Sequence, residues 1–280
     1  MNMSNPFKID EPTCISFSGG RTSAYMLWRV LQSNGGRLPD EAIVCFANTG
    51  KEEEETLKFV YKCQVHWNVE IIWLEYQDHE DSKQRFKVVN YETAARNGEP
   101  FEAVIRKRNY LPNPVTRFCT AELKIRTINK YLRSIGWKDH NENTDWVGIR
   151  ADEMRRAAKI DRSRTPLVTD GVTVHHVNQF WSEQPFNLEL ATYNGRTLAG
   201  NCDLCFLKPA SQVASLIAEK PERGVWWARM EALALALASK PSGAVFRSDR
   251  PKYAEMIRIS KEQIDMFDHN EEAISCFCGD

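Results

Sequence analysis

The stretch TCISFSGGRTS, residues 13–23, predicts a strand, a tight glycine turn and the start of a helix. Thr13 to Phe17 is a short run rich in β-branched and aromatic residues, too short for a helix. After Ser18-Gly19-Gly20 the apolar residues fall on one helical face, namely Ala24, Tyr25, Leu27, Trp28 and Leu31. A glycine pair there lets the backbone approach a phosphate closely, and the helix N-terminus supplies N–H groups. The stretch therefore predicts a phosphate-binding turn.

The residues that follow repeat this alternation. Ala42 to Ala47 (AIVCFA) predicts a second strand that ends at Asn48-Thr49-Gly50. A helical pattern through Leu57 and Val60 comes next, and Val69 to Leu74 (VEIIWL) predicts a third strand. Strand–helix alternation favours an α/β fold, a parallel twisted sheet with helices on both faces, in which ligands bind beyond the carboxyl ends of the strands.

The remainder of the chain is less regular. Residues 75–116 are polar and rich in turn residues, which predicts a long loop region with at most short helices. Beyond it we expect a helix over 120–133 and a strand over 146–149, and then a strand at 172–177 and helices at 211–219 and 226–238. We therefore expect a nucleotide-binding domain over 1–170 and a mainly helical, cysteine-containing extension over 171–280 that packs on it.

Composition bounds the class of protein. The chain has 280 residues, 42% hydrophobic and 27% charged, enough to bury a sizeable core. No apolar run is long enough for a membrane span, and the first residues lack the apolar stretch of a signal peptide, so we expect a cytoplasmic protein with no membrane partner. From Val104 to Arg164 there are 15 Lys and Arg against 7 Asp and Glu, which predicts an anionic partner, with nucleic acid among the candidates.

The eight cysteines favour metal or redox chemistry over disulfides in a chain with no secretion signal. Cys202 and Cys205 have the Cys-x-x-Cys spacing that lets two thiolates reach one metal ion or cluster, and Cys276 and Cys278 form a second pair. Cys119 precedes a predicted helix beside Arg117, a position that would lower the pKa of its thiol. Three cysteines lie in or beside apolar elements and are expected to pack in the core, namely Cys14, Cys45 and Cys63.

Four segments resemble the phosphoadenosine phosphosulfate (PAPS) reductase family and the related ATP pyrophosphatases. Residues 16–23 (SFSGGRTS) resemble the pyrophosphate loop SGG-x-D-S. Phe46 to Gly50 with Glu55-Thr56 and Phe59-Val60 is similar to the motif F-x-D-T-G followed by E-T-x-x-F-V. Arg117-Phe118-Cys119-Thr120 with Lys124 resembles R-x-C-(C/T)-x-x-x-K, and residues 148–156 resemble the loop G-x-R-x-x-E-x-x-x-R. The four segments cover roughly residues 13–160 in the family's order.

The resemblance implies an adenine nucleotide α-hydrolase-like fold and an adenine nucleotide, ATP or a sulfated adenylate, as ligand. It implies catalytic roles for Cys119, Lys124 and Arg150. The nucleotide-binding residues that we expect from it are Ser18, Gly19, Gly20, Arg21, Thr22, Ser23, Asn48, Thr49, Gly50, Gly148 and Arg156. Guanidinium groups bind phosphate or sulfate oxygens in pairs, and a lysine supplies a mobile charge, so Arg150, Arg156 and Lys124 also suit an anionic ligand on chemical grounds.

Two positions depart from the family's pattern. Thr22 stands where the pyrophosphate loop has an aspartate, and Asn48 stands where the second motif has one. Two acidic groups that could help to hold Mg²⁺ are therefore absent, which weighs against an ATP-splitting reaction that depends on Mg²⁺. The glycine-rich loop weighs the other way, because reductases of the family usually carry a less glycine-rich one.

The resemblance also bears on the cysteines. Adenylyl-sulfate reductases of the family hold a [4Fe-4S] cluster with a Cys-Cys pair and a later Cys-x-x-Cys. Cys119, Cys202 and Cys205 match three of these ligands, and Thr120 takes the place of the fourth. We expect such a cluster with Cys276 as a candidate fourth ligand. Zn²⁺ on Cys202, Cys205, Cys276 and Cys278 is the alternative, and uncoordinated thiols are a third interpretation.

Three hypotheses of function follow. The first is an enzyme that binds an adenine nucleotide and reduces or transfers sulfur with a cysteine-ligated cluster. The second is ATP-dependent sulfur insertion into DNA or tRNA, in which the basic stretch 104–164 would bind the nucleic acid. The third is a nucleotide-binding regulator without turnover. A homodimer or a partner protein that donates sulfur is compatible with the first two.

Overall fold

The structure is a computed structural model that describes residues 5–137, 145–193 and 196–262. Its strands are β1 (Thr13–Phe17), β2 (Ala42–Asn48), β3 (Ile72–Glu75), β4 (Lys87–Val89), β5 (Trp146–Val147), β6 (Thr192–Tyr193) and β7 (Arg196–Thr197). Its helices of eight or more residues are α1 (Arg21–Ser33), α2 (Glu54–His66), α3 (Glu99–Arg108), α4 (Arg126–Ser134), α7 (Val174–Glu183), α8 (Ala210–Glu219), α9 (Glu222–Leu237) and α10 (Tyr253–Glu262). The shorter helices are η1 (Ser82–Gln84), η2 (Thr120–Ile125), α5 (Met154–Ala157), η3 (Arg162–Arg164), α6 (Pro166–Thr169) and η4 (Pro241–Ala244).

Five strands form a mixed sheet in the order β4-β3-β2-β1-β5. The strands β3, β2, β1 and β5 are parallel, and β4 pairs antiparallel with β3. The prediction of a wholly parallel sheet is therefore wrong at this edge. Parallel neighbours need a crossover of a dozen or more residues, usually a helix, whereas the short return through η1 brings the chain back in the opposite direction.

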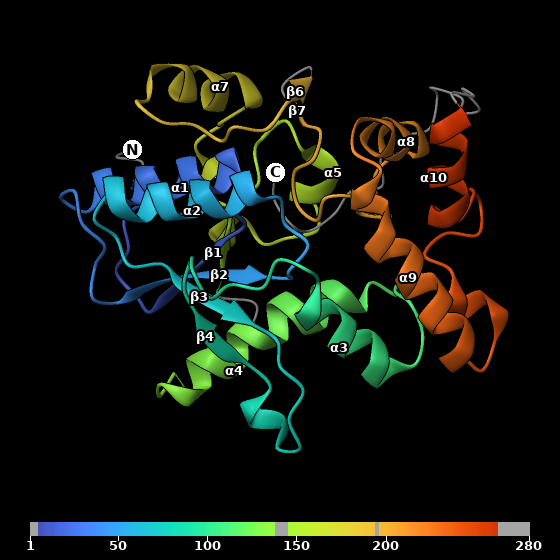
Figure 1. The fold of residues 1–280 in the computed structure, drawn as a ribbon. Helices are drawn as coiled ribbons and strands as arrows, with labels where there is room; N and C mark the ends of the chain where they lie inside the picture. Colours follow the sequence, from blue (N-terminus) through green and yellow to red (C-terminus); the bar gives the residue numbers. More distant parts are fainter. Residues whose placement is uncertain (1–4, 138–144, 194–195, 263–280) are drawn as a thin grey trace.

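Helices cover both faces of the sheet, as the alternation of strands and helices predicts (Figure 1). On one face α1 and α2 share a hydrophobic core with Trp181 of α7. On the other, Ile128 and Leu132 of α4 pack against Cys14 and Cys45 of the sheet. The α/β class is confirmed, and the arrangement is compatible with a Rossmann-like fold.

A further core joins α3 to the C-terminal helices, where Phe101 packs with Trp227 of α9 and Tyr253 of α10. These helices lie beside the sheet rather than over it (Figure 1). Leu167 and Trp181, on either side of residue 170, belong to the core around α1. The division into domains at this residue stays a prediction.

Most of the helices are where the sequence places them, including α8 and α9. The strand predicted at 172–177 is wrong, because α7 begins at Val174. Thr173 caps this helix, and His176 returns the bond from its side chain to the backbone N–H of Thr173 at 3.0 Å. The helix predicted at 120–133 is present, but its first six residues, η2, form a π-helix. No helix in the described part of the chain is long and apolar enough to cross a membrane.

Candidate functional site

The glycine turn lies at the carboxyl end of β1, directly before α1. Ser18 and Ser23 close it, with their hydroxyl oxygens 2.9 Å apart and the Ser18 N–H donating to Ser23 Oγ at 3.2 Å. Gly19 has φ +80°, and a Cβ there would lie 2.8 Å from the Thr56 methyl group. A Cβ on Gly148 would lie 2.8 Å from Ser23 Cα, so the segment after β5 also needs a glycine to approach the turn.

A cavity of about 310 Å³ opens beside this turn, at the carboxyl ends of β1 and β5. Its walls come from the sheet, from η2 and α4, and from the segment through α5 and η3. The residues that line it are Ser16, Phe17, Ser18, Ala47, Thr120, Lys124, Ile125, Ile128, Asp145, Val147, Gly148, Ile149, Arg156, Lys159, Ile160 and Arg164. The structure therefore brings together four residues that the sequence nominates from separate segments, namely Ser18, Lys124, Gly148 and Arg156.

Arg156 is the most distinctive of these residues. Its side chain is 9% exposed, and its Nη1 is paired with Glu153. The Nε and Nη2 atoms are buried and have no hydrogen-bond partner among the described residues. Buried guanidinium donors without acceptors are costly, so this edge of Arg156 suits an anionic ligand in the cavity.

Arg150 lies beside the turn, and its donors are occupied. It donates to Thr22 Oγ1 from Nη1 at 3.0 Å and to Asp152 Oδ1 from Nε at 3.1 Å. Thr22 thus accepts a bond from a buried arginine where the family has a carboxylate. The geometry suits Arg150 to hold the turn in place.

Asn48 is fully buried at the end of β2 and has a packing reason to be an amide. Its Nδ2 donates to Glu75 Oε1 at 2.6 Å and to the Ala95 carbonyl at 2.9 Å, and its Oδ1 accepts from the Gly50 N–H at 3.1 Å. An aspartate here would face Glu75, a second buried carboxylate. The change from the family's pattern therefore goes together with the hydrogen bonds of Glu75.

Thr49 connects this strand end to the C-terminal helices. Its hydroxyl donates to the Glu52 carboxylate and lies 3.4 Å from Cys202 Sγ. Lys51 pairs with Asp203 at 2.9 Å, and both side chains are buried. Cys202 is thus held beside the loop that follows β2.

Cys119, Cys202 and Cys205 all pack against the core of the C-terminal helices. Within the described residues, no three His, Cys, Asp or Glu side chains gather closely enough to hold a metal ion. Cys276 and Cys278 lie outside those residues. The cluster and the zinc site both stay predictions, and we derive no step through either.

Burial raises the pKa of the Cys202 thiol, and the neighbouring Glu52 and Cys205 raise it further, while Lys124 opposes them. Lys124 is therefore near enough to act electrostatically on both the cavity and Cys202. Cys14, Cys45 and Cys63 are buried, as predicted.

Much of the basic stretch is neutralised by neighbouring acids. Arg106 pairs with Glu102, Lys107 with Asp78, and Arg108 and Arg126 with Glu122. The cations that line the cavity lie elsewhere, on η2 and around α5. The excess charge of the stretch therefore does not form one continuous binding surface, and Lys124, Arg156, Lys159 and Arg164 surround the cavity.

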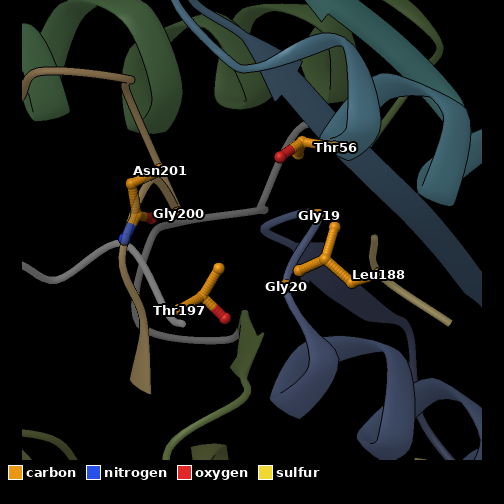
Figure 2. Close-up of a pocket in the computed structure, with 7 residues that line it drawn as sticks. All are labelled: Gly19, Gly20, Thr56, Leu188, Thr197, Gly200 and Asn201. Carbon is orange, nitrogen blue, oxygen red and sulfur yellow. The ribbon is translucent and has the colours of Figure 1, made fainter. Parts of the chain in front are cut away.

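Sequence reasoning did not find Lys159 or Arg164 as cavity residues, because neither belongs to a motif. It also did not find the cover over the glycine turn. Residues 187–201, which we call the strap, cross the turn and leave a chamber of about 10 Å³ against Gly19 and Gly20 (Figure 2). The strap follows α7, in a region where no motif points back to residue 19.

The sequence matches no family model. It is similar to an uncharacterized nin region protein of Escherichia phage lambda, with 28% identity over 219 residues, which are 75% of this chain and 70% of the phage protein. It is also similar to an uncharacterized protein of Methanocaldococcus jannaschii, with 26% identity over 238 residues. That match takes in 83% of this chain but 43% of the archaeal protein.

Proposed function

We propose that the protein is an enzyme that binds an adenine nucleotide, ATP or a sulfated adenylate, in the cavity beside the glycine turn. The base and sugar would occupy the cavity, whose volume of about 310 Å³ suits a ligand of nucleotide size. The phosphates or sulfate would lie along Ser18 to Ser23, at the N-terminus of α1. The motifs of the PAPS reductase and ATP pyrophosphatase families support the proposal, and sulfur reduction or transfer is the reaction that they suggest.

The observation that carries the proposal is the unpaired edge of Arg156. Arg156, Lys124 and Lys159 line one cavity with Asp145 as its single carboxylate. Such an excess of cations attracts a phosphate or sulfate and stabilises negative charge that develops on a leaving group. In this arrangement Arg156 binds the anion, Lys124 neutralises charge on the reacting group, and Arg150 positions the turn through Thr22.

Calorimetric titration with ATP, adenylyl sulfate and AMP tests the binding. Arg156→Met should weaken the binding of ATP or adenylyl sulfate by about 10- to 100-fold, because a charged hydrogen-bonding pair is lost. Arg156→Lys should recover part of this loss. The exposed Arg162 provides the control, since Arg162→Met should bind as the native protein does. If the native protein binds none of these nucleotides, or if Arg156→Met binds them equally well, the proposal fails.

A nucleic-acid substrate is the second candidate, and one observation favours it. Arg155, Lys159 and Arg162 are exposed around α5 and η3, next to the cavity. Cations there could contact the phosphates of a DNA or RNA strand whose reacting nucleotide enters the cavity. Affinity for single-stranded DNA or tRNA should then fall steeply with salt, and Lys159→Gln with Arg162→Gln should flatten that dependence. Binding that does not change with salt would exclude this candidate.

A further inference from the structure

A second, much smaller cavity lies on the other side of the glycine turn, under the strap. It has a volume of about 10 Å³ and lies between Gly19-Gly20, Thr56 of α2 and residues 197–201 of the strap. Figure 2 shows Gly19 and Gly20 on one side of this chamber and Gly200 and Asn201 on the other. The space is about that of one water molecule.

Thr56 supplies a donor with nothing to bind. Its side chain is 2% exposed, and its Oγ1 is buried with no hydrogen-bond partner among the described residues. Its methyl group faces Gly19, and Figure 2 shows its hydroxyl oxygen turned toward Gly200 and Asn201. A buried hydroxyl that lacks a partner is costly, which indicates that something polar belongs in the chamber.

Two helix N-termini meet at the same place. α1 begins directly after Gly20, and Thr56 lies in the first turn of α2. The N–H groups of these first turns and the two helix dipoles favour a negative charge. Two carboxylates at the start of α2 are already paired, Glu53 with Arg223 at 2.8 Å and Glu54 with Arg96 at 2.6 Å. Their charges are thus balanced within the protein.

The strap closes the chamber, and Arg21 holds it. Arg21 donates from Nε to Asn187 Oδ1 at 2.8 Å, from Nη1 to Thr192 Oγ1 at 2.6 Å and from Nη2 to the Leu188 carbonyl at 2.7 Å. With these bonds in place, the chamber is too small for a phosphate or sulfate group. A group of that size enters only if the strap lifts.

We propose that the chamber is the binding site for the terminal tetrahedral oxyanion, phosphate or sulfate, of the nucleotide, that Thr56 donates a hydrogen bond to it, and that the strap moves to admit it. The inference rests on the proposed function, because the larger cavity would hold the rest of the ligand. Thr56 then contacts only ligands long enough to pass the glycine turn. A nucleoside monophosphate stops short of it.

Titration of Thr56→Val and Thr56→Ser with ATP, adenylyl sulfate and AMP tests this site. Thr56→Val keeps the shape and removes the donor, so it should weaken ATP, adenylyl sulfate or both by about tenfold and leave AMP unchanged. Thr56→Ser keeps the hydroxyl and should stay within about twofold of the native protein. A loss with ATP alone identifies a phosphate, and a loss with adenylyl sulfate alone identifies a sulfate.

Equal binding of all three ligands by Thr56→Val overturns the inference, as does an equal loss for AMP. Both results leave the proposed function standing, since the native protein still binds nucleotides. Failure of the native protein to bind any nucleotide removes the proposed function itself. Thermal unfolding of Thr56→Val shows whether the variant is folded, and its Tm should be at or above the native value because an unpaired hydroxyl has been removed.

Discussion

Gly19 and Gly35 both have positive φ, +80° and +76°, but only Gly19 is crowded. A Cβ on Gly35 meets nothing within 4 Å, whereas one on Gly19 meets Thr56 at 2.8 Å. We expect Gly35→Ala to lower the free energy of unfolding by about 1 kcal/mol through backbone strain alone. Gly19→Ala should cost about 3 kcal/mol, because overpacking is added. Denaturant unfolding measures both, and equal losses would show that the turn can relax around a methyl group.

Asn48 offers a test of why the family's aspartate is missing. Asn48→Asp would place two carboxylates in contact with Glu75 at the end of β2, and we expect a loss of about 3 kcal/mol at neutral pH. The pair would bind a proton more readily than separate carboxyls, so the loss should shrink as the pH falls. Adding Glu75→Gln should restore stability at neutral pH. An unchanged Tm in Asn48→Asp would contradict this account.

The same residues show what sequence reasoning could reach at this scale. Ser18, Gly19, Gly20 and Gly148 were nominated correctly for the neighbourhood of the turn, because tight backbone approach leaves a glycine signature. The partners of Asn48 and Arg150 could not be predicted. They depend on side chains such as Glu75 and Asp152, whose positions the local sequence does not specify.

At the scale of elements, the strap has one main fastening. Arg21→Lys keeps the positive charge but cannot form the three bonds of the guanidinium to residues 187–192. We expect faster amide hydrogen exchange at 187–193 in this variant, with the exchange of β1 and β2 unchanged. Arg37→Lys, at an exposed position, is the matched control. Unaltered exchange of the strap would show that its packing alone holds it.

Helix α9 contains a buried carboxylate that should make stability depend on pH. Burial raises the pKa of Glu231, although its Oε2 accepts a bond from the Tyr253 N–H at 2.9 Å. The folded state therefore holds the proton more tightly than the unfolded state, and stability falls as the pH rises through the folded pKa. Glu231→Gln should match the native protein in acid and exceed it by on the order of 1 kcal/mol at pH 8. Denaturant unfolding at both pH values checks the difference.

Element prediction succeeded where the pattern was long and failed where a cap decided. The periodicity of α1, α2 and α9 survives in the structure because each buries one continuous face. Val172 to Val177 looks like a strand by composition, yet Thr173 and His176 form a capping box that starts α7. The antiparallel β4 was missed because three residues of edge strand carry almost no pattern.

At the scale of the whole molecule, the sheet and the C-terminal helices meet at a buried ion pair, Lys51 with Asp203. Asp203 also accepts a bond from Trp227 Nε1 at 2.8 Å. Removing one charge leaves the other buried alone, so Lys51→Met should cost about 3–5 kcal/mol. The double variant with Asp203→Asn should recover much of this loss. If Lys51→Met unfolds like the native protein, the pair contributes nothing to the joint.

The strap has a consequence for the order of events during synthesis. Arg21 and Asn187 are 166 residues apart in the chain. At roughly 5–20 residues per second, the ribosome makes the glycine turn on the order of ten seconds or more before it makes the cover. For that interval the nascent turn is open to any phosphate compound in the surrounding solution. The finished protein differs from its own precursor in this respect, since a guarded entrance arrives only with the last third of the chain.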